Sequence, residues 1–346
     1  LWHTLSLHDA LPICSKGSAV TRWLETAPSY VFVLYAIFAS FTTYFCMYAF
    51  RKPFAAASYE GYTFWLLDLK TVFVISQILG YTLSKYVGIK VCSEISRSRR
   101  ALALVGLILA AEIALVLFAL VPPTFKIAAI FLNGLPLGMV WGMVVSYLEG
   151  RRTSELLLAG LSCSFIVSSG MVKDAGRWLM DNLQVPEFWM PAVTGLCFLP
   201  LYLVSTWFLN RIPPPSEADA EARVEREPMG RKQRIAFVKE FLPGLAMLLI
   251  AYLFLTAYRD IRDNYGIEIF SQLGYGETPA IFTRSELPVA LGVLLALAAL
   301  NLIKDNRRGL LGAYAIMAGG TALIGVSTLL LKANIISGLS WMILIG

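Results

Sequence analysis

Two arginines, each following an alanine and an aromatic residue at the end of a long apolar run, are the residues best suited to bind a ligand. The first run ends in Ala49-Phe50-Arg51-Lys52, and the seventh ends in Ala257-Tyr258-Arg259-Asp260. A charged side chain at membrane depth costs roughly 2.5–3.5 kcal/mol, so it usually faces a protein-lined cavity. The guanidinium fork fits two oxygens of a phosphate or carboxylate. One arginine in each half of the chain therefore predicts a site between the halves that clamps a small anion.

Three tyrosines near these arginines are candidates to complete the site. Tyr48, Tyr81 and Tyr258 could donate hydroxyl hydrogen bonds and form a wall for the organic part of a ligand. The alternative is that they belong to the aromatic belt at the membrane surface, where tyrosine is enriched.

The two arginines also have simpler interpretations. Arg51 could extend along the span to reach the membrane surface, as long basic side chains do. Arg262 competes with Arg259 for the role in the seventh run. Asp260 and Asp263 could neutralise both arginines, which would make residues 259–263 a solvated loop.

Composition indicates a helical membrane protein. Of the 346 residues, 57% are hydrophobic and 15% are charged, and the mean hydropathy is +0.66. Soluble domains are usually about a quarter charged. The apolar residues are gathered into runs long enough to cross a bilayer, which takes roughly 20 helical residues. The net charge of +6 is explained by basic loops on the cytoplasmic side, so nucleic-acid binding is not expected.

The apolar runs divide the chain into two parts around one polar linker. Residues 211–239 contain three consecutive prolines, mixed charges and a basic end, which is typical of a linker. Six runs precede it, which predicts an N-terminal six-helix bundle over 15–210, and a second, truncated bundle is expected over 240–346. Most Lys and Arg fall on the side of the linker, which predicts that the linker is cytoplasmic. The runs cover about 30–58, 64–87, 101–121, 126–148, 155–178, 188–210, 237–258, 280–303, 309–331 and 334–346.

Residues 1–14 are excluded from this interpretation, because 4–13 resemble the translation of a sequencing adaptor. His3 and His8, which are the two histidines of the sequence, lie in this stretch. The last residues, 341–346, fall inside an apolar run, so we expect the sequence to be a fragment.

Several segments resemble the major facilitator superfamily, and in particular its organophosphate:phosphate antiporter branch. Residues 44–54, an aromatic-rich segment ending in Arg-Lys-x-Phe, are similar to the first span of that branch. Residues 80–86 are similar to its Gly-(x)3-Ser-Lys-aromatic pattern. Residues 131–141 resemble its Gly-(x)3-Gly-Met-x-Trp segment. Residues 93–102 resemble the superfamily signature between spans two and three, with Glu94 where aspartate is usual.

This resemblance implies two six-helix halves around a central cavity, and exchange of inorganic phosphate for a phosphorylated metabolite. By motif match, Arg51 and Arg259 would hold the phosphate, with Lys85 close by. Members of the branch can carry a histidine in span five, where Phe165 stands here. Ser162 is a nearby hydroxyl donor, but it cannot change its charge near neutral pH as histidine does.

The sequence thus predicts a monomeric secondary transporter for a small, phosphorylated organic anion, in the cytoplasmic membrane of a bacterium. The mechanism is alternating access, driven by phosphate exchange or by protons. The alternative is a transporter-like membrane sensor that binds such an anion and signals to a partner through the linker. No metal cluster, cofactor motif or nucleophile triad is found in the sequence, so neither a cofactor nor enzyme activity is expected. Gly134, Gly138 and Gly142 form a small-residue ladder that predicts close helix packing.

Overall fold

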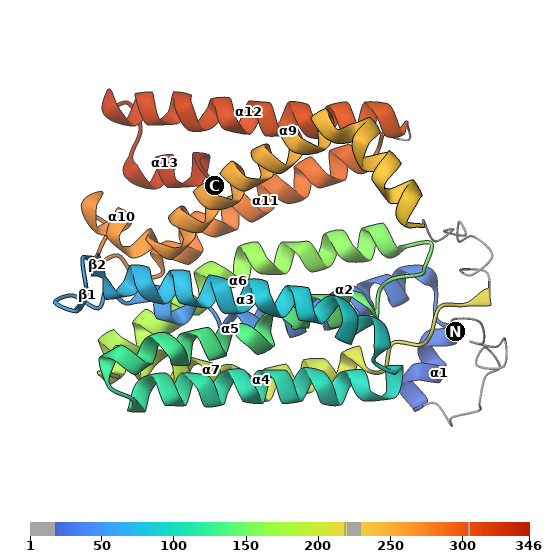
Figure 1. The fold of residues 1–346 in the computed structure, drawn as a ribbon, viewed down its shortest axis with the longest axis horizontal. Helices are drawn as coiled ribbons and strands as arrows, with labels where there is room; N and C mark the ends of the chain where they lie inside the picture. The colour runs from blue at the N-terminus through green and yellow to red at the C-terminus, as the bar shows by residue number, and fades with distance from the viewer. Residues whose placement is uncertain (1–17, 218, 220–229, 304) are drawn as a thin grey trace.

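The computed structural model describes residues 18–346, apart from 218, 220–229 and 304 (Figure 1). Within these residues, nine helices are long and apolar enough to cross a membrane, so the protein is an all-α multi-pass membrane protein. Residues 1–14, predicted to be an artefact, lie outside the described residues, as do 218 and 220–229 of the predicted linker. The nine helices are α2 (Ser29–Tyr48), α3 (Leu69–Glu94), α4 (Arg97–Leu120), α5 (Pro123–Val145), α6 (Ser154–Leu183), α7 (Met190–Leu209), α9 (Arg231–Asn264), α11 (Ile281–Asn301) and α12 (Asn306–Lys332).

The first apolar run is not one helix. The α-helix α2 ends at Tyr48, residues 49–52 form a turn, and a 3-10 helix, η2, follows over Pro53–Ala56. Pro53 has no amide hydrogen to continue the α-helical ladder, but it is well placed at the first position of a new helix. The turn keeps Arg51 and Lys52 inside the protein.

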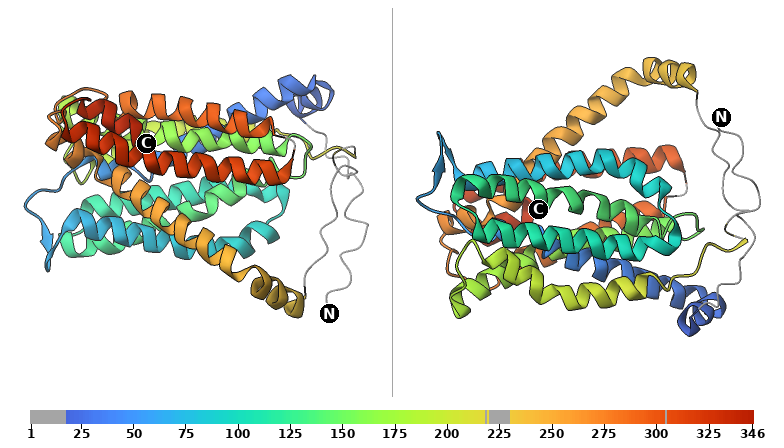
Figure 2. Two further views of the ribbon diagram at one scale, coloured as in Figure 1. Left: turned by 90° about the horizontal axis from the view of Figure 1, so that it is seen from above. Right: turned by 60° about the horizontal axis from the view of Figure 1, so that its bottom comes forward.

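Helix α9 is longer than the run predicted over 237–258. It begins at Arg231, within the predicted linker, because Arg, Lys and Gln are good helix formers despite their polarity. The helix contains Pro243 and is bent. Toward its beginning, α9 diverges from the other helices in both views of Figure 2.

Short elements mark the two ends of the molecule. Strands β1 (Thr63–Phe64) and β2 (Leu67–Asp68) pair antiparallel, and they lie near the short helix α10 (Gly266–Gln272). We call this end the hairpin end. The opposite end, where α1 (Ala19–Thr26) lies and α9 begins, is called the linker end (Figure 1).

Helices α2 to α7, the N-terminal half, surround one apolar core. The core includes Phe50, Phe73, Phe118 and Tyr202, all fully buried. The predicted glycine packing is confirmed for α3 and α5. A Cβ on Gly138 would lie 2.6 Å from the carbonyl oxygen of Tyr81. The absence of a side chain therefore allows the two backbones to touch.

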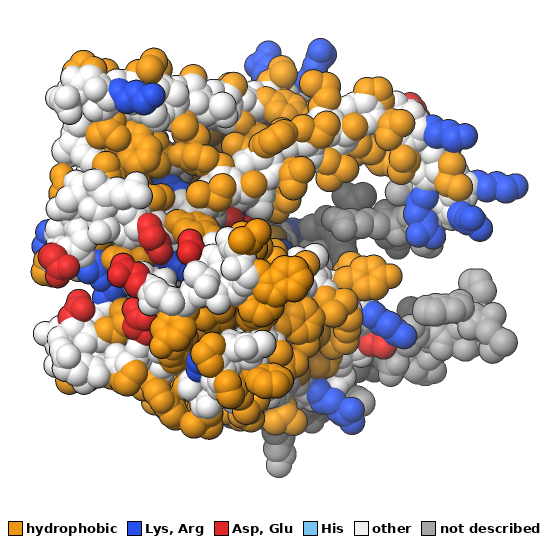
Figure 3. All heavy atoms as spheres, turned by 60° about the vertical axis from the view of Figure 1, so that its left-hand side comes forward, with side chains coloured by type: hydrophobic (Ala, Val, Ile, Leu, Met, Phe, Trp, Pro, Cys, Tyr) orange, Lys and Arg blue, Asp and Glu red, His pale blue; other side chains and the backbone are white. Residues whose placement is uncertain are grey.

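Helices α9 to α13, the C-terminal half, share a smaller core. The predicted tenth run forms the short helix α13 (Gly338–Leu344) within it. The buried members of this core are Phe270, Ile281, Phe282, Met342 and Ile345. The apolar stretch of α9 has no buried residue. Figure 3 shows acidic and basic side chains gathered at the hairpin end between the halves, with hydrophobic side chains covering the flanks.

Candidate anion-binding site

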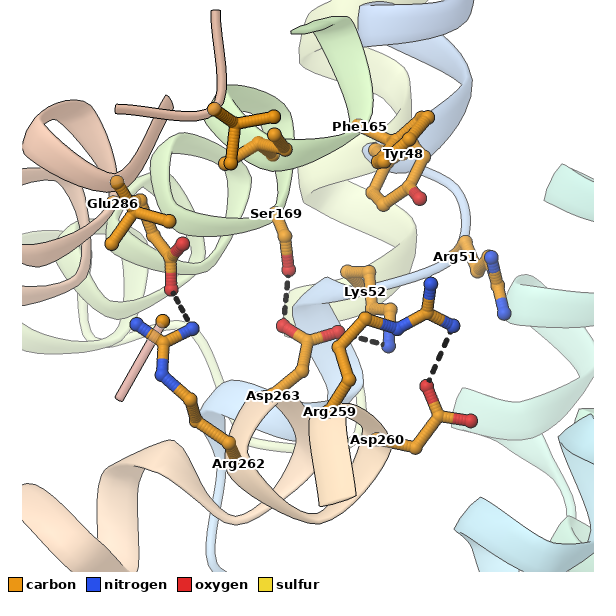
Figure 4. Close-up of a pocket in the computed structure, with 14 residues that line it drawn as sticks. Tyr48, Arg51, Lys52, Phe165, Ser169, Arg259, Asp260, Arg262, Asp263 and Glu286 are labelled. Atoms are coloured by element: carbon orange, nitrogen blue, oxygen red, sulfur yellow. Dashed lines mark hydrogen bonds and ion pairs between the residues drawn. The ribbon is translucent and has the colours of Figure 1, made fainter. Parts of the chain in front are cut away.

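A cavity of about 280 Å³ lies between the two halves (Figure 4). Four basic and three acidic side chains line it, so its charged groups carry a net positive charge. The apolar part of the wall comes mainly from α6 and α11. The lining residues are Tyr48, Arg51, Lys52, Phe165, Ile166, Ser169, Arg259, Asp260, Arg262, Asp263, Glu286, Val289, Val293 and Gly346.

Arg51 is the one cation of this cavity that forms no ion pair with an acidic side chain in the described part of the chain. Its guanidinium carbon lies 4.0 Å from the centre of the Tyr81 ring and 5.8 Å from that of Tyr48. Among the described residues it makes no ion pair, and its buried Nε has no hydrogen-bond partner. Aromatic faces stabilise a cation without neutralising it. Arg51 is therefore a positive group available for an anion.

The two arginines of α9 have different environments. Arg262 is buried, and its guanidinium donates to Glu286 at 2.9 Å and to the carbonyl oxygen of Met342 at 3.0 Å. Arg259 is 62% exposed at its side chain and pairs with Asp260 at 3.1 Å. An exposed pair between sequence neighbours is weak. Arg259 is thus free to exchange its partner, whereas Arg262 holds α9, α11 and α13 together.

One carboxylate joins the halves at the hairpin side of the cavity. Asp263 of α9 lies 2.5 Å from the Nζ of Lys52 and 2.8 Å from the Nζ of Lys173 of α6. Ser169 also donates to it, at 2.5 Å. Lys52 lies in the turn after α2. Burial lowers the pKa of its ammonium group, and the negative charge of Asp263 opposes that shift. We call Lys52, Lys173 and Asp263 the Asp263 cluster.

Further contacts across the halves surround this cluster. Asp174 of α6 accepts hydrogen bonds from the backbone amides of Phe282 and Thr283, at the start of α11. Arg177 donates to the carbonyl oxygen of Gly276. Lys70 of α3 pairs with Glu268 of α10 at 2.5 Å. These contacts close the hairpin end between the halves.

Two buried amides hold the turn that carries Arg51. Asn133 of α5 donates to the carbonyl oxygens of Phe50 at 3.0 Å and Ala111 at 3.1 Å. Gln77 of α3 donates to the carbonyl oxygen of Arg51 at 3.0 Å and to Asn133 at 2.9 Å. The turn is therefore fixed to three helices, because each of these buried polar atoms finds its partner.

Comparison with protein families assigns most of the chain to one family. The model that matches residues 53–346 is described as a family of unknown function, DUF5690. The chain belongs to the DUF5690 family. Comparison with curated proteins gave no match.

This DUF5690 chain brings part of the predicted site together. Arg51, Arg259 and Tyr48 all line the cavity. Tyr81 lies beside it, with Arg51 over its ring and the Nζ of Lys85 4.9 Å from the ring centre. Lys85 itself is exposed on α3 and is not among the cavity residues.

Two other predicted residues of the DUF5690 chain lie away from the cavity. Tyr258 packs against the core of the C-terminal half. The hydroxyl of Ser162 donates to the carbonyl oxygen of Leu158, one turn earlier in the same helix. Phe165, which stands where the branch can carry histidine, does line the cavity.

The alternative interpretation of residues 259–263 was wrong. They are the last turns of α9 rather than a solvated loop, and Asp263 pairs with lysines of the other half.

Sequence reasoning missed Lys52, Ser169 and Lys173 as site residues. Phe165, Ser169 and Lys173 recur every four residues, so they share one face of α6. This spacing is the signal that could have placed Lys173 near the cavity. Its acidic partner lies 90 residues away in the sequence, and nothing local indicates it.

Proposed function

We propose that this protein is a secondary transporter for a small organic anion that binds between Arg51 and Arg259. The observation that carries the proposal is Arg51, which lines a cavity between the two halves and makes no ion pair with any residue that the structure describes. The other basic groups of this cavity have acidic partners. An anion that draws Arg259 from Asp260 would bridge the halves, which is how ligand binding couples to alternating access.

The resemblance to organophosphate:phosphate antiporters supports a phosphorylated substrate. In this proposal the fold is that of the major facilitator superfamily, and residues 211–239 connect the two halves on the cytoplasmic side. A bacterial cytoplasmic membrane fits the excess of basic residues on the linker side. Phosphate also suits the arginine fork, which can donate to two of its oxygens at once.

Alternating access also requires a barrier that can open. In this proposal, the contacts around the Asp263 cluster are that barrier on the outer side. They are individual polar interactions, so the free energy of substrate binding can offset their loss. Opening the barrier does not require an apolar core to come apart.

Binding of inorganic phosphate to Arg51→Lys and Arg259→Lys proteins tests the proposal. Each variant should bind phosphate about ten- to a hundredfold more weakly, since losing a charged hydrogen-bonding geometry costs about 1.5–3 kcal/mol. The double variant should lose less than the sum of the two effects. Arg284→Lys, an exposed arginine outside the cavity, is the matched control and should bind like the wild type.

Phosphate counterflow in proteoliposomes then separates transport from sensing. Exchange that is lost in both cavity variants supports the transporter. Phosphate binding that depends on Arg51 without any exchange would instead support the membrane sensor. Equal phosphate binding by the wild type and all the variants would rule out the proposed anion site.

A further inference from the structure

Glu112 is an acidic side chain buried inside the N-terminal half. It lies in the second half of α4, and 5% of its surface is exposed. Both carboxylate oxygens are buried, and neither has a hydrogen-bond partner within the part of the chain that the structure describes. Among the described residues Glu112 also makes no ion pair. Burial without a partner favours the neutral acid over the ionised carboxylate.

The basic and phenolic groups on the elements around Glu112 make their described contacts with other residues. On α7, the hydroxyl of Tyr202 donates to the carbonyl oxygen of Leu104, two turns away on α4. On α5, the Nζ of Lys126 donates to the carbonyl oxygens at the end of α4. In the turn after α2, Arg51 lies over Tyr81 and Lys52 pairs with Asp263. No described cation is therefore placed to hold a carboxylate at Glu112.

The Glu112 carboxyl lies close to the turn that carries Arg51. The carboxyl and the ring of Phe50 both pack against Gly195, where a Cβ would lie 2.2 Å from the Glu112 Oε2 and 3.0 Å from the Phe50 Cδ1. Phe50 directly precedes Arg51, and its carbonyl oxygen is held by Asn133. A rearrangement of the turn of residues 49–52 would therefore change the packing beside the carboxyl.

We propose that Glu112 is a proton-binding site, and that this proton is coupled to anion transport. In the described conformation the proton is bonded to a Glu112 oxygen, and the group is neutral. When the turn of residues 49–52 moves, the O–H bond breaks, the proton passes to water, and the carboxylate remains. The coupling rests on the proposed transport function, whereas the proton site itself does not.

Infrared spectroscopy of the full chain tests the proton site without any transport assay. At neutral pH the wild type should show the carbonyl stretch of a protonated carboxylic acid, and Glu112→Gln should lose it. Glu94→Gln, at a side chain that is 66% exposed, is the matched control and should keep the band. Equal bands in the wild type and Glu112→Gln would overturn the proton site. The Gln variant should unfold at the wild-type temperature, because an amide closely replaces a neutral acid.

Phosphate transport in proteoliposomes tests the coupling. In Glu112→Gln, phosphate exchange without a pH gradient should persist, and the acceleration of uptake by an imposed pH gradient should be lost. Glu112→Asp should retain that acceleration, because it keeps a carboxyl. Acceleration that survives in the Gln variant would overturn the coupling. If the wild type moves no phosphate, the proposed function and the coupling fail together, and the infrared band still decides the proton site.

Discussion

The two halves of the protein differ in how they are held, internally and to each other. Helices α2 to α7 enclose a continuous core that includes buried aromatic rings and close glycine contacts. The contact between the halves combines the packing of α6 against α11 with charged and polar groups at the hairpin end, such as Asp263 and Asp174. Apolar packing is cumulative and non-directional, whereas ion pairs break at defined positions. The N-terminal half is therefore suited to move as one body, and the junction between the halves is suited to open.

Removing the charge of Asp263 should weaken the contact between the halves, and we expect this to be the largest effect. Asp263→Asn leaves Lys52 and Lys173 without their shared carboxylate, and Lys173 is 1% exposed. Breaking a buried pair costs about 3–5 kcal/mol. We expect the hairpin end to open, so that the distance between spin labels on α6 and α11 increases there.

Asp260→Asn is the control for this change, because its partner Arg259 is mostly exposed. It should leave the label distance unchanged. If Asp263→Asn also keeps the wild-type distance and unfolding temperature, the charges do not hold the halves together.

Adding a methyl group at one glycine should destabilise the N-terminal half, by less than the loss expected for Asp263→Asn. A Cβ in Gly138→Ala would lie 2.6 Å from the carbonyl oxygen of Tyr81 and 2.7 Å from the Cβ of Ser84. Such overpacking costs about 1–3 kcal/mol. Unfolding of the purified protein in detergent should show this loss, with the distance between the halves unchanged.

Gly106→Ala offers a matched comparison, because a Cβ on Gly106 of α4 meets nothing within 4 Å. Its unfolding free energy should change by less than about 1 kcal/mol. Equal losses in the two variants would mean that close packing of α3 and α5 does not account for the stability of this half.

The smallest effect is expected from an exposed pair within one helix. Lys90 and Glu94 lie 4.0 Å apart on α3, with side chains 80% and 66% exposed. Pairs of this kind contribute about 0.3–0.5 kcal/mol. Glu94→Gln should therefore unfold within about 0.5 kcal/mol of the wild type. A larger loss in the same detergent assay would show that charge on this surface stabilises the N-terminal half.

Much of the fold could be predicted from the sequence, because membrane helices are specified by local composition. The runs at 101–121 and 188–210 differ from α4 and α7 by at most four residues at either end. The break after Tyr48 was missed because hydropathy continues through Ala57, although Pro53 interrupts the hydrogen-bond ladder. The beginning of α9 was missed for the opposite reason, because polar residues also form stable helices.

The site was less predictable, because its pairs join distant parts of the chain. Arg51 and Arg259 could be found from their matching positions in two apolar runs. Whether Arg259 or Arg262 is available for an anion could not be predicted, because Glu286, the partner of Arg262, lies on another helix. Lys52 and Asn264 are 212 residues apart, so their contact follows from tertiary packing alone.

The carboxylate of Asp174 gives the junction between the halves a particular mechanical property. It receives the first free amides of α11, which would otherwise lack partners at the start of that helix. These two hydrogen bonds hold the start of α11 in place, but they do not by themselves set the direction of the helix axis. Close by, a Cβ on Gly170 would lie 3.0 Å from the carbonyl oxygen of Phe282, so the two backbones already touch there. While these two bonds hold, helix α11 can tilt against α6 as a lever on a pivot, with small displacement at the hairpin end and large displacement at the linker end; the hairpin end itself opens only when they break.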